Sequence, residues 1–192
     1  MKAINLVGLL VVGVVLLSSC KKDDNGTPQQ VTKTYVYTES IRGSQDISGT
    51  MSNLSPVTLS AIIGTDPANN FKSGEMQVAN CYLEIDGLGN LSVPEGSEVV
   101  LQDFTIQVGS NAAVNLGDCK ITPQGQNEFA SDTPQSTSSF IKVITNIFDG
   151  VTSGSKSASL VVSFTPNVDI ATSDNVKLKI AIGGTYHYVV HE

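Results

Sequence analysis

Short runs of apolar, β-branched and aromatic residues, separated by turns rich in Gly, Pro, Asn and Asp, constrain the fold of this 192-residue chain most strongly. Alternation of apolar and polar residues within a run indicates a half-buried strand, because successive side chains of a strand point to opposite faces. The runs that indicate strands are 33–39, 57–63, 75–86, 98–108, 118–122, 158–165, 176–182 and 185–190, with a weaker one at 46–51. Eight or nine strands at this spacing predict a mainly β fold: an antiparallel β-sandwich, immunoglobulin-like or jelly-roll-like, with a β-barrel as the alternative.

One segment departs from this pattern and predicts an amphipathic helix near residues 134–148. Residues 131–133 offer capping side chains directly before Pro134, and proline suits the first helical position. Gly150 follows as a predicted stop. Helical spacing brings five apolar residues to one face, namely Phe140, Ile141, Ile144, Ile147 and Phe148. We expect this helix to cover an open end or a face of the sheet.

The last two runs predict a C-terminal hairpin that turns at the glycine pair at 183–184. A three-residue loop would place Tyr186 and Tyr188 on the same face as the apolar residues of the preceding strand. A two-residue loop would shift the register by one residue and place His187 and His191 there instead. Because burial favours the aromatic side chains, we expect the tyrosines to point inward and the histidines outward.

The N-terminus carries a short positive start at Lys2, an apolar run over residues 6–17, and then Leu17-Ser18-Ser19-Cys20. Twelve helical residues reach about 18 Å, against the roughly 30 Å of a bilayer's hydrocarbon core, so the run has the form of a secretory signal peptide. Its end resembles the lipobox of bacterial lipoproteins. In that family the cysteine thiol takes a diacylglycerol, and the chain is cut directly before the cysteine.

The resemblance implies that residues 1–19 are a lipoprotein signal peptide and that Cys20 is the lipidation site. Fatty acyl groups such as palmitate would then hold the protein to a membrane, and two or more chains are needed for stable anchoring. We expect residues 20–32 to form a lipidated flexible tether and residues 33–192 a single β-rich domain.

The residues after Cys20 indicate where the anchored protein resides. The family's inner-membrane retention signal is an Asp directly after the cysteine, and this chain has Lys21 there. The acidic pair after Lys22 resembles the surface-export signal of lipoproteins in Bacteroidota-type bacteria. We therefore expect an outer-membrane lipoprotein exposed at the cell surface, with a periplasm-facing domain as the alternative.

Two further cysteines, Cys81 and Cys119, remain for a domain in an oxidising compartment. Both lie on the apolar phase of their strands. A disulfide between them would stabilise the fold by about 3–4 kcal/mol on the chain-entropy model. The alternative is two separate buried thiols, since cysteine packs well as a small apolar residue.

The sequence contains no complete catalytic motif. His187 and His191 would lie about 13 Å apart on one strand, too far to share a zinc ion whose ligands lie at about 2 Å. Ser139 and Lys142 fit the S-x-x-K pattern of penicillin-binding enzymes, but the accompanying K-T-G is missing. The carboxylates are scattered along the chain. We therefore expect no catalytic residue, no metal site and no cofactor.

Charge and anchor together suggest a function. A formal charge of −7 with a single Arg argues against nucleic acid as a partner. We expect a non-catalytic binding or structural role in the cell envelope, with the membrane reached through Cys20 and a protein or glycan as the further partner. The alternatives are a carrier of small apolar ligands with a barrel cavity, and a carboxylate-based hydrolase acting on glycans.

Overall fold

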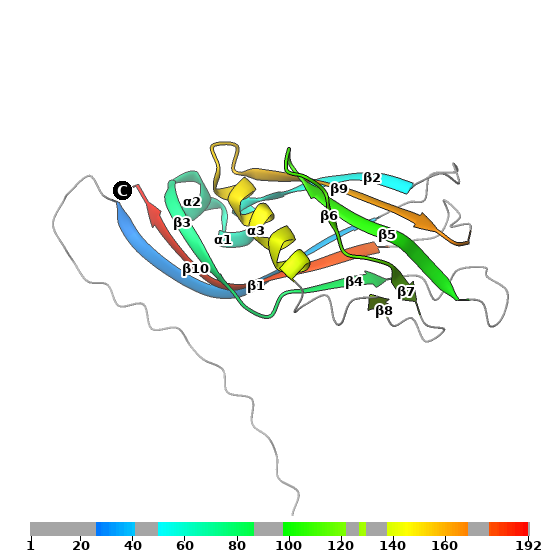
Figure 1. The fold of residues 1–192 in the computed structure, drawn as a ribbon. Helices are drawn as coiled ribbons and strands as arrows, with labels where there is room; N and C mark the ends of the chain where they lie inside the picture. Colours follow the sequence, from blue (N-terminus) through cyan, green and yellow to red (C-terminus); the bar gives the residue numbers. More distant parts are fainter. Residues whose placement is uncertain are drawn as a thin grey trace, which may run out of the picture.

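The computed structural model of this protein describes residues 26–40, 50–86, 98–121, 127–129, 138–168 and 177–191. Its strands are β1 (Thr27–Ser40), β2 (Thr50–Thr58), β3 (Phe71–Val78), β4 (Tyr82–Asp86), β5 (Val99–Val108), β6 (Val114–Asn115), β7 (Cys119–Ile121), β8 (Asn127–Phe129), β9 (Ser157–Pro166) and β10 (Lys177–Val190). Its helices are α1 (Leu59–Ile63), α2 (Thr65–Asn69) and α3 (Ser138–Thr152). The strands form two separate antiparallel sheets around one core, which confirms the predicted β-sandwich rather than a single closed sheet (Figure 1).

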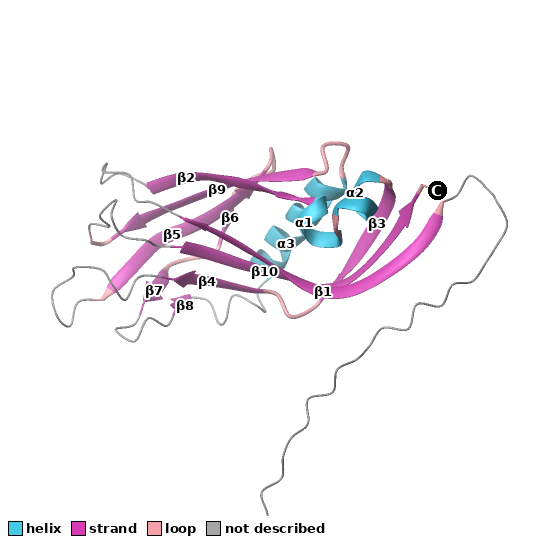
Figure 2. Cartoon of the chain, turned by 180° about the vertical axis from the view of Figure 1, so that it is seen from behind, coloured by secondary structure: helices cyan, strands magenta, loops and turns pink. Residues whose placement is uncertain are grey.

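Sheet A has four strands, with β10 at its centre. β1 pairs with β10 along its whole length, from Thr27 opposite Val190 to Ser40 opposite Lys177. On the other edge, β10 pairs with β3 near Val190 and with β4 near Lys177. Figure 2 shows β1, β10 and β3 curving away from the other sheet at the end where Val190 lies. The first and last strands of the described domain are therefore direct neighbours.

β10 is one continuous strand, so the predicted C-terminal hairpin is wrong. The glycine pair lies where the partner strand breaks between β3 and β4. A Cβ atom at Gly183 would meet the carbonyl oxygen of Ala79 and would lie 3.0 Å from that of Asn80. Glycine is needed here for a close approach of two backbones and not for a turn.

The predicted facing of the aromatic residues in β10 is confirmed. Tyr186 is 1% exposed and Tyr188 is 8% exposed, whereas His187 is only half-buried and His191 is exposed. An unbroken strand alternates its faces through Gly184, so the tyrosines share the inner face with Ile180. The prediction that the tyrosines point inward is right although the hairpin is wrong, because a three-residue loop and a continuous strand both place Tyr186 and Tyr188 on the inner face.

Sheet B has the order β2-β9-β5-β7-β8, with β6 pairing to β5. Residues 57–63, predicted as a strand, instead end β2 and form α1, which is a correction. Leu59, Ile62 and Ile63 have the i, i+3, i+4 spacing of a helix, and all three are buried. The Thr58 hydroxyl caps α1 by accepting a hydrogen bond from the Ala61 N–H at 3.3 Å.

The predicted amphipathic helix is confirmed as α3, which is described from Ser138 and ends at Thr152, four residues beyond the expected end. The predicted cap at 131–134 lies outside the described residues. Gly150 does not stop the helix; it allows close packing against β9, where an added Cβ would lie 2.8 Å from that of Ala158. Ile141 is 36% exposed and lies off the buried face. That face comprises Phe140, Val143, Ile144, Ile147 and Val151.

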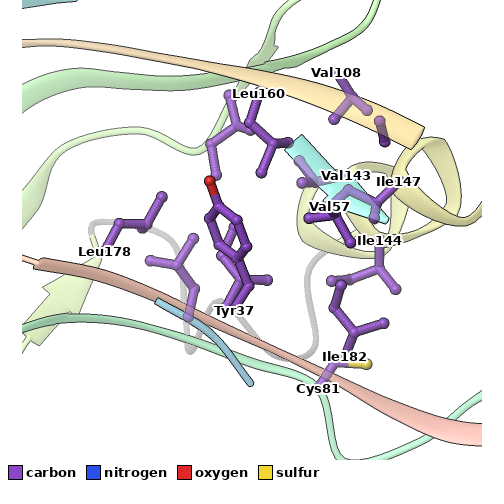
Figure 3. Close-up of a cluster of buried hydrophobic side chains, with 14 of the residues drawn as sticks. Tyr37, Val57, Cys81, Val108, Val143, Ile144, Ile147, Leu160, Leu178 and Ile182 are labelled. Carbon is purple, nitrogen blue, oxygen red and sulfur yellow. The ribbon is translucent and has the colours of Figure 1, made fainter. Parts of the chain in front are cut away.

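α3 lies between the sheets where sheet A curves away, and it contacts strands of both sheets (Figure 1). Figure 3 shows Val143, Ile144 and Ile147 between side chains from both sheets. The Phe148 ring on α3 lies 6.1 Å from that of Tyr186 on β10. Where the sheets face each other directly, the Tyr37 hydroxyl on β1 donates a hydrogen bond of 2.7 Å to the Ser55 carbonyl oxygen on β2. Within the described ranges, no helix has the length and apolarity needed to span a bilayer.

Some element boundaries also differ from those expected. Residues 27–32 pair with β10, so the strand predicted from residue 33 already begins at Thr27. The run at 75–86 is interrupted at 79–81 and forms two strands. Of the weaker run at 46–51, only the last two residues are described, as the start of β2. Residues 1–25, including the predicted signal peptide and Cys20, lie outside the described part of the chain.

Candidate functional site

Cys81 lies at the break between β3 and β4 and completes the pairing of β10 there. The Gly183 N–H donates to the Cys81 Sγ at 3.3 Å, and the thiol donates back to the Gly183 carbonyl oxygen at 3.3 Å. The Ala79 N–H donates to the same carbonyl at 2.8 Å. Burial raises the pKa of the Cys81 thiol, with partial opposition from its backbone hydrogen bonds. A neutral thiol in this position is suited to structure rather than to nucleophilic chemistry.

Cys119 lies on β7 in sheet B, completely buried. Burial raises the pKa of its thiol to about 12. Cys81 and Cys119 are thiols in different sheets and are not joined to each other, so the disulfide is not formed and the alternative of two buried thiols holds. The alternation of both residues with apolar neighbours correctly predicted burial, but burial alone does not bring two strands together.

His187 on β10 and His191 directly after this strand do not form a ligand set. His187 faces Glu75 on the neighbouring strand β3, and the His191 N–H donates to the Asn70 carbonyl oxygen at 2.7 Å. In the part of the chain that the structure describes, no group of three His, Cys, Asp or Glu side chains could hold a metal ion. Ser139 and Lys142 lie in the first turns of α3, with Lys142 exposed.

Three of the described carboxylates, Glu84, Glu98 and Asp118, have separate structural partners. Glu98 pairs with Lys120 at 2.8 Å, and Glu84 pairs with Lys179 at 3.7 Å; both pairs are partly exposed. Such pairs contribute little to stability.

Asp118 has a different role, because its Oδ1 accepts a hydrogen bond of 2.9 Å from the Asp103 N–H. Asp103 has a φ of 50° at a bulge in β5, so this bond supports a left-handed backbone conformation that non-glycine residues rarely adopt.

A first hollow of about 380 Å³ lies over β1, β10 and β3 near the Thr27 end of sheet A. Gln29, Glu75, His187 and Tyr188 contribute to its lining. It forms partly because Gly74, which pairs with Tyr188, has no side chain. Burial raises the pKa of the Tyr188 hydroxyl. The hollow is wide open, and the side chains of Glu75 and His187, which pair across β3 and β10, point to the opposite face of the sheet from that of Tyr188.

A second hollow of about 320 Å³ lies between the C-terminal half of α3, the turn after β5, and the start of β9. Four alternate serines from the turn before β9 and from β9 itself line one side of it: Ser153, Ser155, Ser157 and Ser159. Asn146 on α3 lines the other side, and its Nδ2 atom is buried without a hydrogen-bond partner. Its lining therefore consists of neutral groups that donate and accept hydrogen bonds.

Sequence reasoning did not single out this second hollow. The alternating serines at 153–159 were a usable signal, because four hydroxyls at every second residue suit a polar strand face. Asn146 gave no signal, since one amide within a helix is ordinary. A buried amide donor without a partner is an exception in folded proteins and marks a place where a bound group could satisfy it.

The comparisons with known proteins do not assign this fold or these hollows to a family. No protein-family model, no curated protein and no solved structure matches the chain.

Proposed function

We propose that this protein is a lipid-anchored, non-catalytic binding protein of the bacterial cell envelope, held in the outer membrane and exposed at the cell surface. The observation that carries the proposal is the sequence Leu17-Ser18-Ser19-Cys20 after an apolar run. A β-domain that begins at Thr27 follows it closely. This order matches a cleaved and lipidated leader joined to a folded domain.

The spacing limits how far the domain can stand from the membrane. Seven residue steps separate Cys20 from Thr27, and a fully extended chain covers at most about 25 Å in that number. The end of sheet A that holds Thr27 and Val190 is therefore nearest to the lipid. The opposite end, where Ser40 pairs with Lys177, can extend away from the surface.

The described groups favour binding over catalysis. The hollow beside Asn146 offers hydroxyls and amides with no acid, imidazole or thiol in its lining. Its polar lining and the filled apolar core also argue against a carrier of small apolar ligands. Three of the described acids, Glu84, Glu98 and Asp118, are engaged one by one and give no support to a paired-carboxylate hydrolase.

Metabolic labelling with a fatty acid tests the anchor. The full chain and a Ser18→Ala variant, which keeps a small residue before the cut, should both incorporate labelled palmitate. Cys20→Ala should lose the label and leave the membrane fraction, because the thiol that takes the lipid is gone. Labelled Cys20→Ala would refute lipidation at this residue. Protease added to intact cells should remove the domain, and its protection would refute surface display.

A further inference from the structure

The outer edge of β1 is the most unusual surface of the described molecule. β1 is 14 residues long and lies at the end of sheet A, with β10 on one side only. Among the described residues, no strand pairs with its other edge. A long unpaired edge presents backbone N–H and C=O groups that can pair with another strand.

The sequence of this edge is self-complementary when it is read antiparallel about Val36. In that register Thr34 lies opposite Thr38 of a second copy, Tyr35 opposite Tyr37, and Lys33 opposite Glu39. Every pair occurs twice because a two-fold axis passes through Val36. Opposite charges, aromatic pairs and threonine pairs are the cross-strand neighbours that stabilise antiparallel sheets.

The two charged residues distinguish this register from its neighbours. Lys33 and Glu39 both lie on the inner face of β1 and are partly buried. Within the described part, neither side chain belongs to an ion pair. A shift of two residues in either direction would leave Lys33 opposite Tyr37 or Glu39 opposite Tyr35. Only the register centred on Val36 places each charge opposite its counterion.

Lys33 alone would discourage pairing, because an inward-pointing lysine on an edge strand is a common protection against association. Burial lowers the pKa of its ammonium group, which reflects the cost of holding the charge there. A carboxylate from Glu39 of a second copy offsets that cost. Lys33 thus discourages pairing with unrelated strands but not with β1 of a second copy.

The outer face of β1 agrees with the same register. Val36 is 45% exposed and is one of two large apolar side chains that the described residues leave exposed. Its neighbours on this face, Thr34 and Thr38, are also exposed. Pairing about Val36 places the two valines against each other and covers both.

We propose that two copies of this protein pair their β1 strands antiparallel about Val36, joining their A sheets into one continuous sheet. The interface is isologous, so each copy contributes the same residues. The proposal rests on the strand itself and not on the lipid, so failure of the anchor would not affect it. Confinement of both copies to one membrane would raise their effective concentration and favour pairing.

Cysteine crosslinking of the full chain in membranes tests the register directly. Val36→Cys places two thiols across the axis, at a spacing that a disulfide can bridge, and should give a crosslinked dimer on mild oxidation. Thr34→Cys and Thr38→Cys are matched controls on the same face, whose thiols would lie about 13 Å from their own copies. Each control alone should not crosslink, but co-expression of the two should. The unsubstituted chain reports any background from the native cysteines.

Charge reversal tests the selectivity. Lys33→Glu and Glu39→Lys should each weaken dimerisation about tenfold, because two attractive pairs become repulsive. The double variant, or a mixture of the two single variants, should restore it. Circular dichroism confirms that each variant is folded. Equal crosslinking at all three cysteine positions, absence of a Val36→Cys dimer, or single reversals without effect would each overturn the proposal.

Discussion

β1 and β10 are equally long and pair along their whole length, yet the burial of their side chains differs greatly. β10 lies between strands on both sides, and even Ala181 on its outer face is fully buried. β1 has one fully buried side chain, that of Tyr37, and an outer face that is exposed throughout. Burial of a strand in this sandwich therefore depends on its neighbours and not on its length.

Truncation of one side chain in each strand should give the largest contrast. Ile180→Ala in β10 removes a completely buried side chain and should cost about 2–5 kcal/mol in the free energy of unfolding. Val36→Ala in β1 should change it by no more than about 0.5 kcal/mol in the monomer, since Val36 is 45% exposed. Urea denaturation measures both. Equal losses would mean that β1 is buried as β10 is.

An added Cβ where β10 closely approaches the backbone beside β3 and β4 should cause an intermediate loss of stability. β1 has no glycine at which this test could be made. Gly183→Ala forces a Cβ against the carbonyl oxygens of residues 79 and 80 and should cost about 1–3 kcal/mol. Gly154→Ala is the control, because a Cβ there meets no atom within 4 Å. Thermal unfolding should separate the two variants clearly. A neutral Gly183→Ala would show that the junction with β3 and β4 is loose.

The smallest effect concerns the phenol groups and depends on pH. The Tyr186 hydroxyl donates to the Ile182 carbonyl oxygen at 2.7 Å, and burial raises the pKa of this hydroxyl to about 12. The folded state therefore holds this proton more tightly than the unfolded chain, whose tyrosines ionise near pH 10. Stability from this group is fully present below about pH 10 and is lost as the pH rises toward 12.

Tyr186→Phe should cost about 1 kcal/mol at neutral pH, because one buried hydrogen bond is lost, and should flatten part of that alkaline decline. Tyr35→Phe on β1 is the matched control: burial raises the pKa of its hydroxyl too, but in the described structure that hydroxyl makes no hydrogen bond. It should cost less at neutral pH. Unfolding curves at pH 8, 10 and 11 compare the variants. An unchanged alkaline slope in Tyr186→Phe would contradict the assignment.

Alternation predicted which side chains are buried better than it predicted where chains turn. The tyrosines of β10 were placed correctly because the face of a side chain depends only on parity along the strand. Gly183 and Gly184 were taken for a turn, since glycine is favoured both in turns and where backbones approach closely. The packing partner that distinguishes these cases, the carbonyl of Ala79, is more than 100 residues away.

Short helices and long-range pairings were the other limits of the sequence. Leu59, Ile62 and Ile63 fit a strand or one helical turn; in the structure they form a helix that buries all three and that the Thr58 hydroxyl caps. Cys81 and Cys119 were expected together, but they belong to different sheets. The second hollow, beside Asn146, depends on the contact of α3 with β9, which no local sequence pattern predicts.

The pairing of the first strand with the last also determines how the domain would carry a mechanical load. A lipid at Cys20 would pull β1 from its Thr27 end, and a partner bound to β10 at Lys177, opposite Ser40, would pull β10 in the opposite direction. Such a force shears the β1–β10 ladder, so all 14 residue pairs resist together. A pull through the chain beyond Val190, which lies beside Thr27, would instead open the ladder one pair at a time. Single-molecule pulling from these two sets of points should therefore give a high and a low rupture force from the same fold.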